Sequence, residues 1–234
     1  MISGILSFIG ITAIIAVGVV FYRARGSEHS EDKRKKFLDA LTAFVEGQLV
    51  PLADFENSFA VSFRYEGVPF VYEDIEEKII TACQYSGNLK CPTRTKLGLS
   101  FSEKPRGSIK VSLDSLHDVA AGWVRHDSKL LLPKPLKEFD VYTSDRAVAE
   151  KLLADEYLVE MLARFKCVDG RGRPVMSLHF LNGEVVLRFH PPGGLQPTRL
   201  DLMQNVSSID PYLDRMKMIA QKVDQLCEEK RHGQ

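Results

Sequence analysis

The sequence predicts an α+β protein in which an N-terminal transmembrane helix precedes a domain with an antiparallel sheet covered by helices. Three observations support this fold class. Residues 2–22 form an apolar run without a charged side chain, and about 20 such residues are enough to cross a bilayer as a helix. Apolar and polar residues alternate in short segments separated by turn residues, as in β-hairpins. Elsewhere apolar residues recur every three or four positions, as in amphipathic helices.

The first expected element is the transmembrane helix at 2–22. A cleaved signal peptide would need a basic start, a shorter apolar run and small residues at its cleavage site, and none of these is present. Basic residues close to a span stay on its cytoplasmic side. Those near this span all follow it: Arg23, Arg25, Lys33, Arg34, Lys35 and Lys36. The sequence therefore predicts a single-pass protein of the inner cell membrane, with its N-terminus outside and its domain in the cytoplasm.

A polar segment at 23–32 is expected to link the span to a domain over 33–230. Lys plus Arg and Asp plus Glu number 31 each, and 44% of the residues are hydrophobic, which is ordinary globular content. This balance argues against nucleic acid as a partner.

The spacing of the cysteines matches no zinc-binding pattern, so reduced thiols in the cytosol are the simpler expectation. The chain contains Cys83, Cys91, Cys167 and Cys227. Two disulfide bridges would be expected only if the topology were reversed.

The first half of the domain is predicted to contain one helix and two hairpins. The helix spans about 33–49, where apolar residues recur at three- and four-residue steps and Pro51 follows. A hairpin is expected at 58–72, because apolar and polar residues alternate around a Glu-Gly-Val-Pro turn. A second hairpin is predicted at 95–113 around a Lys-Pro-Arg-Gly turn.

The second half begins with a strand near 138–143 that leads into one or two helices. Ser144 or Asp145 is placed to cap the first of these helices, because short polar side chains satisfy the free backbone N–H groups at a helix start. Apolar residues then continue at helical spacing as far as Phe165.

The third hairpin, at 175–190, carries the clearest turn signal of the chain. Asn182 and Gly183 lie between two apolar runs, and this dipeptide favours a two-residue type I′ turn. The turn pairs Leu181 with Glu184, Phe180 with Val185, Leu178 with Leu187 and Met176 with Phe189. The last three pairs share one face, which we expect in the core. The other face, which we expect to meet solvent or a partner, carries Ser177, His179, Glu184 and Arg188.

The last helix is predicted over about 208–230. One side carries an apolar stripe from Ile209 to Leu226, and the opposite side is charged. We expect the stripe to cover the sheet. A coiled-coil contact with a second copy, and hence a homo-oligomer, is the alternative.

Within 132–190 the sequence resembles uncharacterised bacterial single-pass membrane-anchored proteins of unknown function. These share an aromatic strand, a helix with paired leucines and a following hairpin. The residues that carry the likeness are Phe139, Val141, Tyr142, Asp145, Leu152 and Leu153. The resemblance implies a prokaryotic, membrane-tethered α+β domain and no particular activity.

The motifs of phosphate-binding loops, zinc proteases, serine hydrolases and calcium loops are absent from the sequence, and we predict no cofactor and no metal. His117, Asp118 and His126 lie within the segment Asp114–Asp127, where residue types able to transfer protons are densest. His179, Glu184 and Arg188 on the outer face of the third hairpin are candidates for binding an anionic group.

These observations favour a membrane-tethered interaction or scaffold protein whose cytoplasmic domain binds a partner. The expected partners are the lipid bilayer and a protein. The alternative is a membrane-anchored hydrolase that uses the Asp114–Asp127 cluster, and it requires the histidines to converge on an acid.

Overall fold

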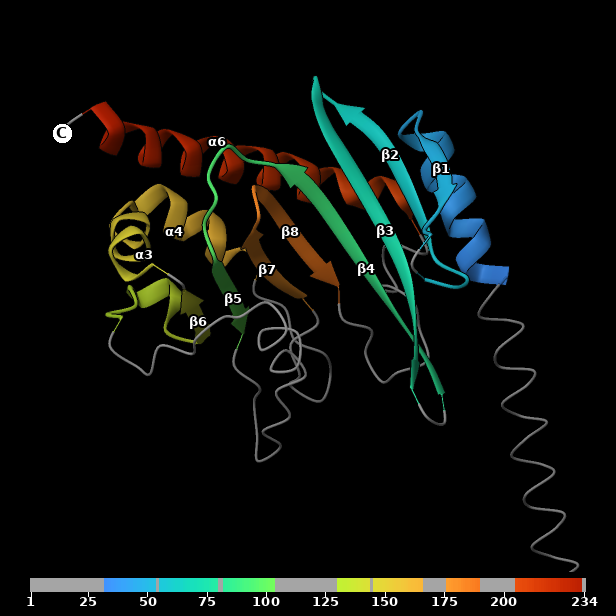
Figure 1. Ribbon diagram of the computed structural model, residues 1–234, viewed down its shortest axis with the longest axis horizontal. Helices are drawn as coiled ribbons and strands as arrows, with labels where there is room; N and C mark the ends of the chain where they lie inside the picture. Colours follow the sequence, from blue (N-terminus) through green and yellow to red (C-terminus); the bar gives the residue numbers. More distant parts are fainter. Residues whose placement is uncertain are drawn as a thin grey trace, which may run out of the picture.

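The structure is a computed structural model that describes residues 32–53, 55–79, 82–103, 130–143, 145–165, 176–189 and 205–232. They form an α+β domain with an eight-stranded antiparallel sheet (Figure 1), so the predicted fold class and sheet type are confirmed. The predicted transmembrane helix at 2–22 lies outside the described residues. Within them, no helix combines the length and the apolar character needed to cross a membrane.

The domain begins with a helix at 32–44. The strands that follow are β1 (Gln48–Pro51), β2 (Phe59–Tyr65), β3 (Val68–Ile79), β4 (Ala82–Pro92) and β5 (Leu99–Glu103). Next come the 3-10 helix η1 (Lys134–Leu136), strand β6 (Phe139–Thr143), and helices α3 (Arg146–Leu153) and α4 (Glu156–Ala163). The last elements are strands β7 (Met176–Leu181) and β8 (Glu184–Phe189), the 3-10 helix η2 (Val206–Ile209) and helix α6 (Asp210–His232).

The strand order is β1-β2-β3-β4-β8-β7-β5-β6. The β7–β8 hairpin is therefore inserted between β4 and β5, which are consecutive along the chain. One row of side chains in register crosses six neighbouring strands on a single face: Val61, Tyr72, Leu89, Leu187, Leu178 and Phe101. All six are buried, and this face forms the sheet side of the core.

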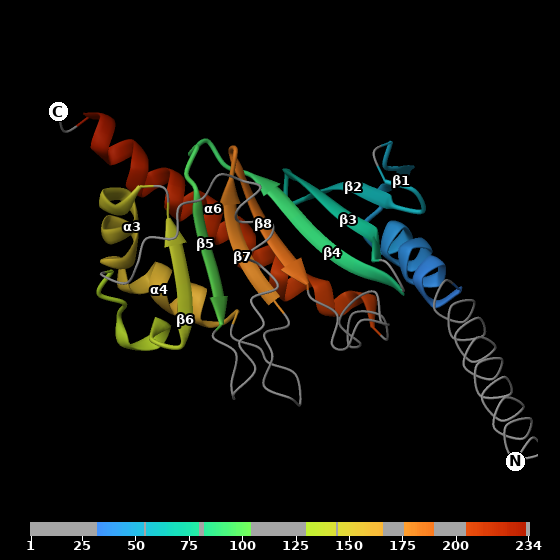
Figure 2. The ribbon, with the colours of Figure 1, turned by 60° about the horizontal axis from the view of Figure 1, so that its bottom comes forward.

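Helices cover this face of the sheet (Figure 2). At one end the ring of Phe37, from the helix at 32–44, packs edge-on against Tyr72 at 5.6 Å between ring centroids. Helix α6 crosses the middle, where Tyr212 packs against Phe189 at 5.5 Å. Helices α3 and α4 lie beside α6 at the β5–β6 end (Figures 1 and 2). The apolar stripe of α6 is buried against the sheet, as predicted for a cover helix.

Two of the three predicted hairpins are confirmed. Strands β2 and β3 pair around Glu66 and Gly67, which both have positive φ. Strands β7 and β8 pair in the predicted register. Asn182 and Gly183 have φ values of 52° and 87°, as a type I′ turn requires.

The predicted hairpin at 95–113 is wrong. Strand β5 exists, but its neighbours in the sheet are β6 on one side and β7 on the other. Both of its edges are therefore occupied, and no position beside it is left for a strand at 107–113. Residues 107–113 themselves lie outside the described residues.

The predicted helix at 33–49 is too long. The helix ends at residue 44, Glu46 takes a left-handed φ of 50°, and Gln48–Pro51 pairs with β2 as an edge strand. Leu49, which continued the helical spacing of apolar residues, instead lies opposite Val61. Farther along, Asp145 caps α3 by accepting the N–H of Val148 at 3.1 Å, so this predicted cap is confirmed.

Candidate functional site

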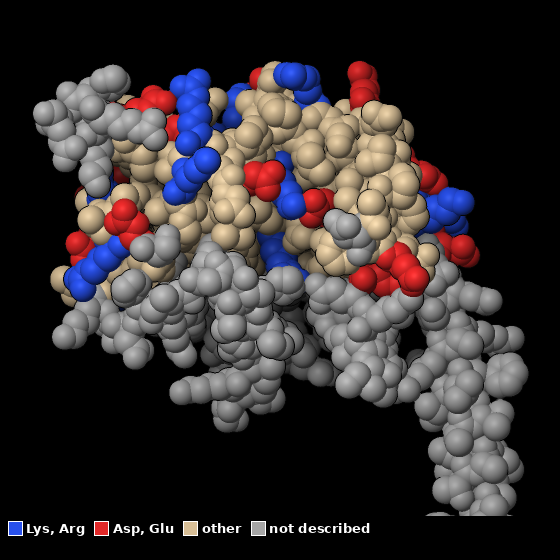
Figure 3. Space-filling view, viewed as in Figure 1, with Lys and Arg blue, Asp and Glu red and all other residues tan. Residues whose placement is uncertain are grey.

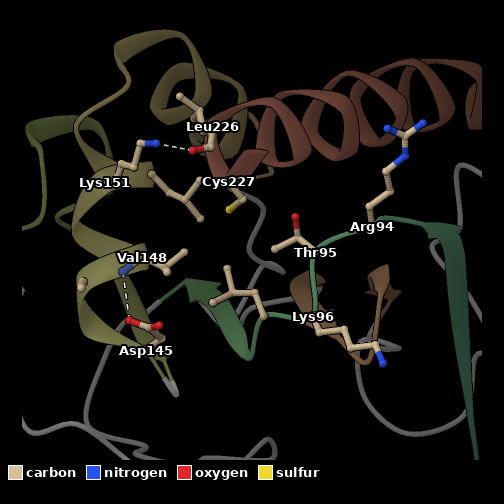
Figure 4. A pocket seen from close by; sticks show the side chains of 11 residues that line it. Arg94, Thr95, Lys96, Asp145, Val148, Lys151, Leu226 and Cys227 are labelled. Atoms are coloured by element: carbon tan, nitrogen blue, oxygen red, sulfur yellow. Dashed lines mark hydrogen bonds between the residues drawn. The ribbon is translucent and has the colours of Figure 1, made fainter. Parts of the chain in front are cut away.

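A cleft with a volume of about 690 Å³ opens between the segment 94–97, helix α3 and the C-terminal half of α6 (Figure 4). We call it the α3–α6 cleft. Ligand sites in proteins commonly have volumes of about 300–1,000 Å³. Its apolar lining consists of Leu97, Ala147, Val148, Leu152 and Leu226, and its polar lining consists of Arg94, Thr95, Lys96, Asp145, Lys151 and Cys227.

Hydrogen bonds to Asp224 of α6 hold the segment 94–97 in place as one wall of the cleft. The Asp224 carboxylate accepts the backbone N–H groups of Arg94 at 3.0 Å and Thr95 at 3.1 Å, and the Thr95 hydroxyl at 2.9 Å. The Thr93 hydroxyl also donates to it. The N–H of Thr93 donates in turn to the carbonyl of Gly183 at 2.8 Å. The Asp224 carboxylate thus fixes the loop after β4 against α6, and the Thr93 N–H fixes it against the turn of the β7–β8 hairpin.

The opposite wall is attached to α6 by two lysines. The ammonium of Lys151, on α3, donates to the carbonyl of Leu226. Asp155 caps α4 by accepting the N–H of Leu158 at 2.9 Å and pairs with Lys222 of α6 at 2.9 Å. Desolvation works to raise the pKa of Asp155, but the Leu158 N–H and Lys222 outweigh it, and the pKa is lowered. Asp155 is therefore a carboxylate at neutral pH.

The lining of the cleft is apolar inside and positive at its rim. In Figure 4, Val148 and the sulfur of Cys227 face the space between the walls, whereas Arg94 and Lys96 extend outward from the 94–97 wall. The lining holds three cations and one carboxylate, Asp145. Arg94 pairs with Glu228 at 3.1 Å, but both side chains are exposed, and such pairs contribute only about 0–1 kcal/mol.

Charged residues of both signs alternate over the described part of the face seen in Figure 3. No broad patch of one sign is visible there, so the positive rim of the cleft is a local feature. Local charge of this kind affects a ligand held in the cleft more than the approach of a polyanion.

The cysteines differ in accessibility. Cys227 has a free thiol in the lining of the cleft. Cys91 is buried, and its burial raises the pKa of the thiol to about 12, which makes it unreactive at neutral pH. Cys167 and the side chain of Cys83 lie outside the described part of the structure. Within that part, no cluster of three or more His, Cys, Asp or Glu side chains could hold a metal ion.

The predicted hydrolase cluster, with His117, Asp118 and His126 inside Asp114–Asp127, lies wholly outside the described residues. The structure therefore leaves this alternative as a prediction. Arg23 and Arg25, which were assigned to topology, also lie outside. Lys33, Lys35 and Lys36 are exposed on the helix at 32–44.

The candidate residues of the third hairpin are spread along its length. They lie on the sheet face opposite the helices, but Glu184 pairs at the turn end and Arg188 at the other end of β8. His179 is only 8% exposed, and its ring nitrogens lie 2.9 Å from the Ser100 hydroxyl and 2.7 Å from the Ser177 hydroxyl. The expectation that this face meets solvent or a partner is therefore wrong for Ser177 and His179, which are buried and hydrogen-bonded.

Arg34 is buried, although the sequence assigned it to membrane topology. Its guanidinium pairs with Asp74, lies 3.8 Å from Glu76, and donates to the carbonyl of Asn57. Burial raises the pKa of Asp74 to about 6, against the opposing effect of Arg34. Arg34 precedes the buried Phe37 and Leu38 by three and four residues, so the helical period already placed it on the apolar side.

Sequence reasoning missed the α3–α6 cleft. Its lining comes from three segments separated by about 50 and 75 residues along the chain, and none of them carries a motif. The one available signal was the polar Thr-Arg-Thr-Lys run at 93–96, directly after Pro92.

Comparison with known proteins adds no functional assignment: no protein-family model matches the chain, and no curated protein matches it. The resemblance of 132–190 to bacterial membrane-anchored proteins stays a prediction. The function is therefore argued from the cleft.

Proposed function

We propose that the protein is a membrane-tethered binding protein, anchored by residues 2–22, that holds a cytoplasmic protein partner in the α3–α6 cleft. The observation that carries this proposal is the cleft itself, with its apolar interior and cationic rim. Protein interfaces gain most of their binding energy where a few side chains fill well-packed pockets.

The position of the cleft supports a partner that approaches from the cytoplasm. The helix at 32–44, which comes after the predicted anchor and linker in the sequence, packs on β3 through Asp74 and Tyr72. The cleft borders the segment that leads into β5. Four strand spacings of about 4.8 Å, or roughly 19 Å, separate these strands in the sheet. In Figures 1 and 2 the helix at 32–44 and α3 lie at opposite ends of the domain.

The chemistry of the lining favours binding over catalysis. Among the described lining residues there is no histidine, and the one carboxylate, Asp145, is used as a helix cap. A general base needs hydrogen-bond access to a substrate proton. Neither Lys96 nor Lys151 has a carboxylate partner among the residues that line the cleft. The hydrolase alternative depends on His117 and His126 and stays a prediction.

A photo-crosslinking amino acid placed at Val148 of the full-length chain tests the proposal in cells. Val148 faces the cleft, whereas the exposed Glu160 on α4 lies outside its lining, so the same substitution there is the matched control. We expect a discrete crosslinked protein from Val148 that is absent from Glu160. The proposal is wrong if Val148 yields no product, or only the products that Glu160 yields.

The membrane topology is tested separately with a membrane-impermeant thiol reagent. Cys227, in the cleft, is expected to react only after the membrane is permeabilised, and Cys227→Ser serves as the control. Labelling of Cys227 in intact cells would place the domain outside the cytoplasm.

A further inference from the structure

We infer that the occupant of the α3–α6 cleft is a short segment of a cytoplasmic protein that carries apolar side chains with Asp or Glu next to them. This inference rests on the proposed function, because it names the chemistry of the partner at the same site.

The apolar part of the segment follows from the interior of the cleft. Leu97 and Leu152 are buried beneath it, and Val148 and Leu226 complete its lining. The volume of about 690 Å³ exceeds what a single side chain fills. Helix α3 and the segment 94–97 form opposing walls, and α6 joins them (Figure 4). An apolar groove of this kind suits a segment that inserts more than one apolar side chain.

The acidic part of the segment follows from the charges of the lining. The lining holds three cations and one carboxylate, and Asp224 and Glu228 contact the 94–97 wall from outside the lining. Lys96 and Lys151 are the lining cations without a carboxylate partner among the described residues. The carboxylate of Asp145 already accepts the N–H of Val148. Lys151 donates to a neutral carbonyl, that of Leu226, so no carboxylate neutralises it there.

The two rim cations of the 94–97 wall are available to a partner. Lys96 is exposed and forms no ion pair within the described part of the chain. Arg94 can exchange its exposed partner Glu228 for another carboxylate, because an ion pair between solvent-exposed groups is weak. Opposite charge at the rim of an interface sets specificity and the rate of association.

The test selects peptides from a displayed library of random 12-residue sequences on the purified full-length chain. Selected peptides are expected to be enriched in Asp or Glu next to Leu, Ile, Val or Phe. A synthetic representative should bind roughly tenfold more weakly to the double variant Arg94→Glu, Lys96→Glu, and more weakly at high salt. The matched control, Lys134→Glu, Arg164→Glu, makes the same change of charge at exposed positions outside the cleft lining and should bind like the wild type.

Modification of Cys227 locates the bound peptide. N-ethylmaleimide should abolish binding to the wild type, whereas binding to Cys227→Ser should be the same before and after treatment, each protein being compared with its own untreated sample. If the peptides that bind in the cleft are basic or uncharged, the inference that the segment is acidic is wrong, while the proposed function stands. If palmitate binds in the cleft and no peptide does, the occupant is an acyl chain and the inference of a protein segment is wrong. If no peptide binds in the cleft and Val148 gives no crosslink in cells, both the inferred segment and the proposed function are wrong.

Discussion

The Asp224 carboxylate of α6 accepts both the N–H and the hydroxyl of Thr95, a residue 129 positions earlier in the chain. It accepts the N–H of Arg94 as well. The bonds between these distant positions fix the segment that becomes one wall of the α3–α6 cleft. The stability of the domain and the shape of the cleft therefore depend on the same side chain.

Asp224→Ala is expected to destabilise the domain by about 1–3 kcal/mol, because it removes a charged acceptor shared by several donors. It should also weaken binding in the cleft, since the 94–97 wall loses its attachment. Urea unfolding and titration with a cleft-binding peptide would measure the two effects. Glu228→Ala, which removes only the exposed pair with Arg94, is the control and should cost less than about 1 kcal/mol. Equal losses in the two variants would contradict this role of Asp224.

Arg34 attaches the helix at 32–44 to the sheet through a buried cluster that contains two acids, Asp74 and Glu76. Arg34→Met would leave both acids buried without this cation. We expect a loss of about 3–5 kcal/mol in the free energy of unfolding at pH 7, the usual cost of breaking a buried ion pair. The exposed neighbour Lys35 provides the control, because Lys35→Met should change stability by less than about 0.5 kcal/mol.

The stability of the domain should depend on pH through Asp74. Its pKa is raised by burial from 3.8 to about 6 in the folded state. A raised carboxyl pKa means that the folded state holds the proton more tightly, so this contribution is complete below about pH 4 and is lost as pH rises through 6. The loss amounts to about 3 kcal/mol, at about 1.4 kcal/mol per pKa unit.

Asp74→Asn isolates this effect, because the amide does not titrate. Urea unfolding of both proteins between pH 4 and 7 should show the wild type losing stability relative to the variant as pH rises. A difference between the two proteins that stays constant across this range would show that Asp74 has an ordinary pKa.

The parts of the fold that the sequence predicted well are those with local determinants. Asn182 and Gly183 define a turn within two residues, and the turn sets the register of the whole β7–β8 hairpin. The stripe of α6 repeats over more than four turns, so its helical period was clear. The cap at Asp145 likewise depends only on a residue three positions away.

The parts that the sequence did not predict depend on contacts between distant segments. Strand β5 pairs with β6 and β7, about 40 and 80 residues later, and no pattern within 95–113 indicates those partners. Strand β4 was missed because Ser86, Gly87 and Asn88 interrupt its apolar residues. The cleft was missed because its walls come from segments that are far apart along the chain.

The contact between Gly87 of β4 and Tyr72 of β3 gives a final prediction. A Cβ atom at Gly87 would lie 2.4 Å from the Tyr72 hydroxyl oxygen, and Tyr72 is fully buried. Gly87→Ala is therefore expected to lower the free energy of unfolding by about 1–3 kcal/mol through overpacking.

The adjacent Ser86 is the control. Its buried hydroxyl has no hydrogen-bond partner among the described residues, so Ser86→Ala should leave stability unchanged or raise it by up to about 1 kcal/mol. In a double-mutant cycle measured by thermal unfolding, Tyr72→Phe should be less costly in the Gly87→Ala background than in the wild type, because the hydroxyl then creates the clash. Additive effects of the two substitutions would show that the alanine is accommodated elsewhere.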